Sequence, residues 1–550
     1  MYGDMFGDFS RLTFERANGY SSVVRLQGRV GIEADDNEST AILLHLLRTF
    51  TADVIGPFGG PRAGLGFEVE PVTEDQRVVT DLWIGPGRYY VDGILVESGV
   101  PSPCSAPAAA PDEEPPKDVP AEDERHAAHA AAEDGREGWT RYYAQPDVFL
   151  DRERAQDVLP DQLPFLVYLM VWERLVTAVE APHVRDVALG ATGADSAART
   201  KVVAQVRATP FVPGGQDPIE PGAKDPDKVR EEILERWADE GWGTALQGAT
   251  GARLRARGRS GDPTEDPCTL SPFARYRGFE NQLYRVQVHV GGEVGESTPT
   301  PTFKWSRDNG SVVFPVESVA GSQAVVQSLG RDDLLSLEVG QWVELVDDER
   351  ALADVRDELF PPEPLYRVEA IDELERRVTL DRELTGGFDA DRHPLLRRWD
   401  HGGPQDAFEG GALPIPGPDE WVELEDGVQV QFASGRFRSG EYWVIPARTE
   451  TGDVEWPGDP DDPPACDPHG PVYHFAPLAL VTDDGAIDLR CAFERLACAA
   501  APAREDPKPR PRPRPPSKRP PKKPVEPPKP KPQPRGGGTR PRAPRKPPNA

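Results

Sequence analysis

The sequence predicts a mainly β protein, built from several small β-hairpin, barrel or sandwich modules with a few short helices and disordered insertions. First, Pro (61) and Gly (52) are abundant and hydrophobic residues make up only 37% of the 550 residues, a composition that suits short strands joined by turns. Second, Asp-Gly or Asn-Gly pairs at Asp92, Asn309 and Asp426 separate β-prone runs, and such pairs favour hairpin turns with positive φ. Third, Phe165–Trp172 is apolar without a break, which is typical of a buried strand.

Shifts in composition divide the chain into eight segments, since 550 residues are too many for one ordinary core. In order, we expect an N-terminal docking segment with a helix and a β-hairpin (1–100), a disordered acidic Ala/Pro insertion (101–138), a β-rich module (139–210), a weakly ordered insertion with one helix (211–275), a β-hairpin module (276–335), a small β-barrel-like module (336–385), a C-terminal β module (386–500) and a disordered basic Pro-rich tail (501–550).

Two helices are expected within these segments. The first is short and capped by Ser39, and its apolar face is formed by Ile42, Leu43, Leu46, Leu47 and Phe50. The second spans Asp227–Glu240 and is flanked by Gly and Pro.

Charge is divided unequally between the body and the tail. Residues 501–550 hold 16 Lys or Arg against 3 Asp or Glu, a net of +13, whereas the other 500 residues hold 47 basic and 90 acidic groups, a net of −43. An acidic body repels nucleic acid and anionic lipid, so we expect no specific nucleic-acid binding. The Pro-rich tail is expected to be extended, either as a solubilising arm or as an electrostatic tether.

Cysteines and the N-terminus indicate the compartment. The five cysteines show no CxxC pair or zinc spacing, which favours reduced thiols. Met1–Phe6 has neither a basic nor an apolar signal-peptide region, so we expect cytoplasmic synthesis without a signal peptide. The longest apolar run is far shorter than the roughly 20 residues of a membrane helix, and we expect no membrane insertion.

Three polar clusters are candidates for chemistry, and for each we favour a structural interpretation. The acidic run 35–38 lacks the EF-hand spacing and precedes a helix, where the dipole favours carboxylates. His469 and His474, near Cys466, lack two further zinc ligands. His401 follows Asp400, but no nucleophile motif accompanies the pair. The sequence therefore predicts no catalytic, cofactor-binding or metal-binding residues, and no cofactor.

Tryptophans on predicted strands are the remaining candidates. Trp305, Trp421 and Trp443 would contact a partner or a glycan if their rings were exposed, because aromatic rings on β-modules stack on sugars. Burial in a core is the more common role of strand tryptophans, since each ring buries a large area.

Eight segments between residues 7 and 490 carry a resemblance to a known family. They are Gly7–Phe14, Gln27–Val30, Tyr168–Arg174, Val187–Gly190, Arg199–Val203, Phe303–Phe314, Glu425–Val430 and Gly440–Thr449. In these segments the chain resembles an uncharacterised bacterial family whose genes often lie near phage-tail-like contractile injection systems. Gln27–Val30, Asn37–Glu38 and Tyr90–Gly93 are also similar to the start of tail-fibre proteins. The acidic insertion and the basic tail are expected to depart from the family pattern.

The resemblance implies a non-enzymatic structural or attachment component, associated with the baseplate or fibres of such a particle. Its partners would be other particle proteins and further copies of itself. The protein would be associated with the particle and released with it. A carbohydrate-binding or cell-surface-binding β protein is the alternative. A glycan-acting hydrolase is a third reading, since 90 acidic residues in the body leave room for a catalytic carboxylate pair.

Overall fold

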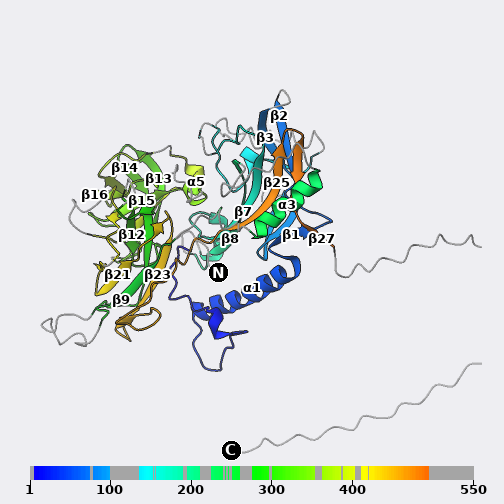
Figure 1. Ribbon diagram of the computed structural model, residues 1–550. Helices are drawn as coiled ribbons and strands as arrows, with labels where there is room; N and C mark the ends of the chain where they lie inside the picture. The colour runs from blue at the N-terminus through cyan, green and yellow to red at the C-terminus, as the bar shows by residue number, and fades with distance from the viewer. Residues whose placement is uncertain are drawn as a thin grey trace, which may run out of the picture. The chain divides into compact units, whose positions relative to one another are not determined.

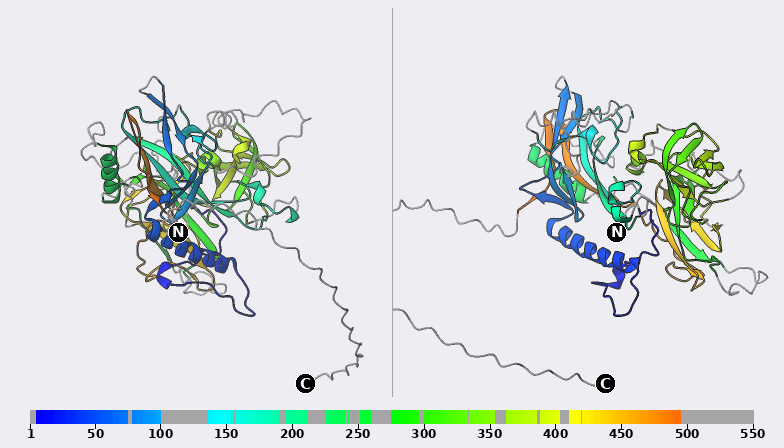
Figure 2. Two further views of the ribbon diagram at one scale, coloured as in Figure 1. Left: turned by 90° about the vertical axis from the view of Figure 1, so that its right-hand side faces the viewer. Right: turned by 180° about the vertical axis from the view of Figure 1, so that it is seen from behind.

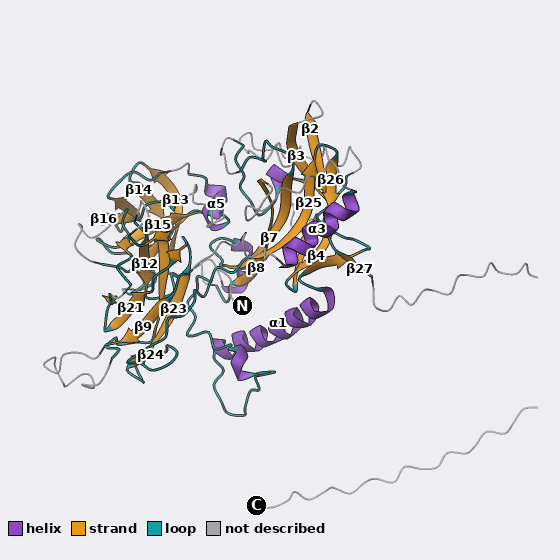
Figure 3. Cartoon of the chain, viewed as in Figure 1, coloured by secondary structure: helices purple, strands orange, loops and turns teal. Residues whose placement is uncertain are grey.

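A computed structural model gives the fold (Figure 1). It describes residues 5–74, 78–99, 136–152, 154, 157–189, 195–210, 225–239, 242, 246, 251–259, 275–295, 300–332, 334–353, 362–385, 388–402, 410–418 and 420–494. Strands dominate these residues and form several small sheets and one closed barrel, which confirms the predicted mainly β class (Figure 3). The tail, 501–550, and nearly all of the acidic insertion, 101–138, lie outside the described residues.

The first core surrounds the continuous apolar strand. β7 (Phe165–Val176) lies between β8 (Arg199–Pro210) and β25 (His474–Thr482), and β26 (Gly485–Asp488) completes this sheet. Every residue of the predicted buried run in β7 is at most 7% exposed, as expected for a strand covered on both faces. Helix α3 (Pro226–Asp239) packs beside β26, with its apolar residues in the same core (Figure 1). The predicted second helix is thereby confirmed.

Two smaller sheets from the N-terminal part join this core. One contains β1 (Phe58–Pro61), β4 (Gly87–Val91), β5 (Ile94–Ser98) and β27 (Ala492–Phe493). The other contains β2 (Val69–Glu74), β3 (Val78–Ile84) and β6 (Thr140–Arg141). The predicted β4–β5 hairpin is confirmed: Asp92 and Gly93 have φ of 47° and 79° at its two-residue turn.

A second core lies between two sheets that pack face to face. The larger sheet has the order β19 (Leu413–Pro414), β12 (Thr302–Ser306), β10 (Gln282–Val290), β23 (Tyr442–Arg448) and β24 (Asp453–Val454). The smaller has β20 (Val422–Glu423), β21 (Val428–Phe432) and β9 (Leu254–Gly258). Their inner faces share one hydrophobic cluster. The hairpin predicted at Asp426 is confirmed, because β20 pairs with β21 across it.

The third core fills a closed six-stranded barrel. Its strands are β13 (Val313–Ala320), β14 (Gln323–Val326), β17 (Arg377–Leu380), β16 (Tyr366–Asp372), β15 (Trp342–Val346) and β18 (Leu395–Trp399). The barrel extends beyond the predicted barrel-like module, 336–385. Strands β13 and β18, which close the barrel, lie on either side of those bounds.

Strand pairing crosses the predicted segment boundaries elsewhere too. β7 pairs with β25 and β10 with β23, so the β-rich module and the hairpin module each share a sheet with the C-terminal module. The Asn309–Gly310 turn also differs from its prediction. Both residues have positive φ, but the turn does not close a hairpin, since β12 enters the five-stranded sheet and β13 enters the barrel.

The first helix is longer than predicted. α1 spans Glu33–Ile55, so Ser39 lies inside it rather than capping it, and the acidic run falls in its first turns. Carboxylates there are favoured by the helix dipole. Of the predicted apolar face only Ile42 is buried, whereas Leu43 and Phe50 are each 65% exposed. Within the described ranges, no helix is both long and apolar enough to cross a membrane.

Candidate functional site

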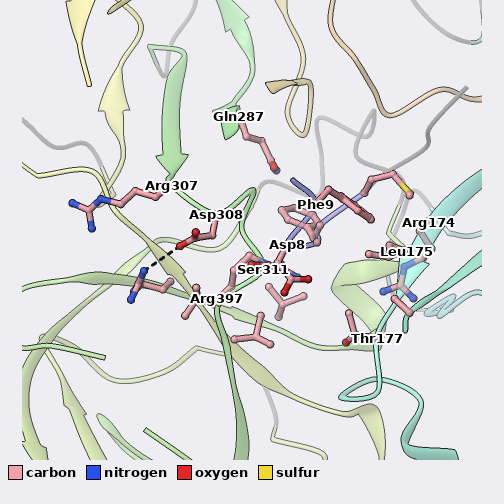
Figure 4. A pocket seen from close by; sticks show the side chains of 18 of the residues that line it. Asp8, Phe9, Arg174, Leu175, Thr177, Gln287, Arg307, Asp308, Ser311 and Arg397 are labelled. Carbon is pink, nitrogen blue, oxygen red and sulfur yellow. Dashed lines mark ion pairs between the residues drawn. The ribbon is translucent and has the colours of Figure 1, made fainter. Parts of the chain in front are cut away.

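A cleft of about 1680 Å³ lies where the N-terminal residues, the first sheet, the five-stranded sheet and the barrel approach one another (Figure 4). Figure 4 shows Asp8 and Phe9 of the N-terminal segment in the middle of the cleft, with Arg174 on one side and Arg307 and Asp308 on the other. We call the set of polar residues at the contact of β12, β15 and β18 the junction. It consists of Lys304, Arg307, Asp308, Glu344, Arg398 and Asp400, with Glu425 beside it.

Arg307 binds two carboxylates from distant segments. Its Nε and Nη2 donate to the two carboxylate oxygens of Glu425 at 2.6 Å each, and its backbone N donates to Asp400 Oδ2 at 2.9 Å. Paired donation of this kind is the strongest arrangement for an arginine and a carboxylate. The hydrogen bond to Glu425 and the nearby Asp400 raise the pKa of Arg307 above its ordinary value. The turn after β12 is thereby tied to the hairpin of β20 and β21.

Asp400 is buried among cationic groups. Arg398 Nε lies 3.0 Å from Asp400 Oδ1, and both side chains are 1% exposed. Arg398 also approaches Asp308 at 3.6 Å. Burial and the charge of Asp400 raise the pKa of Asp308 to about 6, because both disfavour its ionised form. The charged groups of the junction therefore pair with one another within the protein, although Arg398 Nε has no hydrogen-bond partner of good geometry among the described residues.

A second ion pair connects β12 with β15 in the interior. Lys304 Nζ lies 2.7 Å from Glu344 Oε1, and the Lys304 side chain is 2% exposed. Trp399 Nε1 donates to Glu344 Oε2 at 2.9 Å. Burial alone would raise the pKa of Glu344, but the positive charge of Lys304 outweighs it and holds this pKa at about 2. Burial lowers the pKa of Lys304 and Glu344 raises it, so the two groups depend on each other in the contact between the five-stranded sheet and the barrel.

Residues beside the junction hold the N-terminal segment Met5–Gly7. Asn309 Nδ2 donates to the carbonyl oxygens of Met5 and Gly7 at 2.7 and 3.0 Å. The Phe6 ring lies between the guanidinium groups of Arg285 and Arg397, at 3.7 and 3.8 Å from the ring centre. Cation–π contacts are stronger when the cation is desolvated, and Arg285 is fully buried. The Asn-Gly turn thus serves as a binding site for the N-terminal segment rather than as a hairpin turn.

Replacing Asn309 with aspartate is expected to release this segment. Aspartate tolerates the left-handed conformation, but it cannot donate to the two carbonyls and places a charge beside them. The loss should amount to about 1–3 kcal/mol, confined to residues near the N-terminus. Hydrogen exchange of the amides of residues 7–14 should accelerate accordingly. Asp426→Asn, at the tip of a true hairpin, is the matched control, and equal exchange in both variants would contradict this role of Asn309.

The predicted tryptophans occupy different settings. Trp305 and Trp443 are 3% and 0% exposed, and Trp443 Nε1 donates to the carbonyl oxygen of Cys466 at 3.0 Å. Both rings are covered by the packed sheets in this structure, as the core interpretation of strand tryptophans expects. Trp421 is only half-buried, and Arg257 stacks on its ring at 3.8 Å.

His469 and His474 of the C-terminal module contact different parts of the protein. His469 Nδ1 accepts from the Val444 amide at 2.9 Å, and burial lowers its pKa to about 4. His474 Nδ1 lies 2.8 Å from Asp92 Oδ2, at the tip of the β4–β5 hairpin. The part of the chain that the structure describes contains no group of three or more His, Cys, Asp or Glu residues arranged to hold a metal ion.

His401 and Asp400 do not act together. Asp400 faces the arginines of the junction, whereas His401 Nε2 lies 2.8 Å from the Gly411 carbonyl oxygen and its ring stacks on Trp342. Burial lowers the pKa of His401 to about 4, so the ring is neutral at pH 7. It packs as a neutral aromatic side chain.

Sequence reasoning missed the junction. Its members lie on β12, β15 and β18, directly after β18, and in the turns that follow β12 and β20, so only the fold brings them together. One signal was present: Lys304 stands between Phe303 and Trp305, and a lysine inside an otherwise apolar strand needs a buried partner.

The fold and the junction define a multi-module β protein whose N-terminal segment is held by its own body. The chain belongs to DUF6519, a family of unknown function, whose model matches residues 5–131, 156–210 and 245–535. This match includes residues 101–131 of the acidic insertion and residues 501–535 of the tail. No curated protein and no solved structure matches the chain.

Proposed function

We propose that this chain is a non-enzymatic structural component that attaches within a phage-tail-like contractile injection particle, at its baseplate or fibres. The proposal takes the kind of particle from the sequence resemblance. The observation that carries the attachment role is an N-terminal arm, residues 10–32, which is held to the body by polar contacts and exposes several large apolar side chains.

The anchors of the arm are polar contacts to α1 and to β23. Ser10 N donates to Glu33 Oε1 at 2.9 Å, and Arg448 Nη2 donates to the Ser10 carbonyl oxygen at 2.7 Å. Nearer the other end, Arg25 forms an ion pair with Asp36. The arm therefore has a defined position although few of its side chains are buried.

The arm exposes large apolar side chains along its length. Tyr20, Val24, Leu26 and Val30 are 61%, 73%, 64% and 87% exposed. Single exposed apolar residues are common on soluble proteins, but a group of four on one short segment indicates a contact surface. An anchored apolar arm suits attachment to another protein of a particle. The ion pairs of the junction support a structural role as well, because they bind each other and hold modules together.

Attachment through the arm can be tested on particles sedimented from the native cell. The wild-type chain is expected to co-sediment with sheath and tube proteins. The double variant Val24→Asp, Val30→Asp should lower its amount on the particles at least about tenfold, since two unpaired carboxylates would be buried at the contact. Val187→Asp is the control, because Val187 is 94% exposed but lies outside the arm.

The absence of the wild-type chain from the particle fraction would contradict the proposal. So would sedimentation of the double variant at the wild-type level. The genes that adjoin the coding sequence offer an independent check, since sheath and tube genes are expected there.

A further inference from the structure

Helix α1 carries apolar residues on two opposite sides. On one side Ala41 and Ile42 are buried against the body. Arg48 on this side donates to both carboxylate oxygens of Glu173 in β7 at 2.8 and 2.7 Å. The contact is close: a Cβ added to Gly93 would lie 2.2 Å from the Arg48 carbonyl oxygen. The helix is therefore fixed on the first sheet and does not need its other side for attachment to the body.

The other side is a stripe of large apolar residues that nothing in the described part of the chain buries. We call it the outer stripe: Leu43, Leu46, Leu47, Phe50 and Val54, which are 65%, 50%, 57%, 65% and 49% exposed. Figures 1 and 2 show α1 at the margin of the described ribbon, with only the arm beside its N-terminal end. A contiguous group of large exposed apolar side chains marks an interaction site, so a partner is expected on the outer stripe.

We infer that the outer stripe is a self-association surface, and that its occupant is α1 of a second copy of this chain. The spacing supports this choice. Leu43, Leu47, Phe50 and Val54 follow one another at intervals of four, three and four residues, which is the seam of a coiled coil. Two such seams complement each other because each side chain inserts between residues of the facing helix.

Charge supports the same occupant. Copies of a body with a net charge of −43 repel each other, so they can associate only through a surface that lacks acidic groups. Residues 39–52 of α1 contain no Asp or Glu, although acidic residues make up 93 of the 550 in the chain. Apart from Asp53 at its end, the outer stripe thus lies where two acidic copies meet with little like-charge repulsion.

The available area is sufficient for a pair of helices. With on the order of 100 Å² of apolar surface for each large side chain, the outer stripe offers roughly 500 Å² per copy and about 1,000 Å² per pair, the lower limit for a specific interface. The segments 101–138 and 501–550 consist mainly of Ala, Pro and charged residues, and neither supplies an apolar stripe of its own. A second copy supplies exactly such a stripe.

Sedimentation velocity of the purified full-length chain tests the inference. The wild type is expected to associate as its concentration rises. Leu47→Glu should weaken this association at least about 30-fold, because two carboxylates without partners would be buried per pair. Leu47→Met, which conserves volume, and Leu374→Glu, at a residue that is 94% exposed in the turn between β16 and β17, should associate like the wild type. Leu47 is more than half exposed, so its replacement leaves the fold intact.

A wild type that stays monomeric at all concentrations would overturn the inference, as would a Leu47→Glu variant that associates normally. The biological role of self-association rests on the proposed function, but the self-association and the proposed function can each fail without the other. A monomeric chain that co-sediments with particles would overturn self-association alone. An oligomeric chain that is absent from particles would support self-association and contradict the proposed function.

Discussion

Replacing Glu344 with glutamine is expected to lower the free energy of unfolding by about 3–5 kcal/mol, the usual cost of leaving one member of a buried ion pair without its partner. Lys304 would stay buried without its paired carboxylate, and the cost is that of burying an unpaired ammonium group or of removing its proton. The Trp399 Nε1–H donor would also lose the charged acceptor that strengthens its hydrogen bond. Urea unfolding at pH 7, followed by tryptophan fluorescence, measures the change.

The matched control is Glu317→Gln. Glu317 pairs with Arg376 at 3.4 Å, but the two side chains are 40% and 44% exposed, and such pairs contribute only about 0.2–1 kcal/mol. If Glu344→Gln cost no more than Glu317→Gln, the buried pair would not stabilise the contact between the five-stranded sheet and the barrel.

The double replacement Lys304→Met, Glu344→Leu separates stability from specificity. Apolar residues of similar volume can replace a buried ion pair at little cost, so the double variant should recover most of the stability that Glu344→Gln loses. It would not restore the acceptor for Trp399 Nε1, and a small residual loss is expected. Recovery of this kind would show that the pair determines how the two modules meet more than how strongly they bind.

Sequence reasoning succeeded where the information is local. The hairpins at Asp92 and Asp426 follow from two residues each, because only a few residue types adopt positive φ at both turn positions. At Asn309 the same local signal predicted a hairpin, and the prediction was wrong. The turn has the predicted conformation, but the strands on either side pair with β10, β14 and β18 instead of with each other.

Long-range pairing could not be read from the sequence. β10 and β23 are separated by about 150 residues, and their register depends on which apolar faces fit, not on any motif within either strand. The junction has the same origin. Arg307, Asp400 and Glu425 are ordinary polar residues in the sequence, and only the fold brings one guanidinium between two carboxylates. The exposure of the outer stripe was also missed, since periodicity alone cannot say which apolar side of a helix meets the body.

Replacing Trp443 with alanine tests whether the strand tryptophans act as core or as contact residues. The ring is fully buried and packs against Phe432 at a centroid distance of 6.4 Å. Its removal would leave a large cavity between the two packed sheets, and the expected loss of unfolding free energy is about 3–5 kcal/mol. Thermal and urea unfolding should both report it.

Trp421→Ala is the comparison. Trp421 directly precedes the short edge strand β20, and its half-buried ring stacks on Arg257 instead of filling a core. Its loss should cost about 1 kcal/mol, the order of an exposed cation–π contact. A Trp443→Ala variant that kept its stability and lost binding to a glycan array would contradict the core role and favour carbohydrate binding. If Trp443→Ala strongly destabilised the protein and Trp421→Ala did not, Trp421 would be the tryptophan among the three whose ring can reach a partner, because Trp305 is also buried.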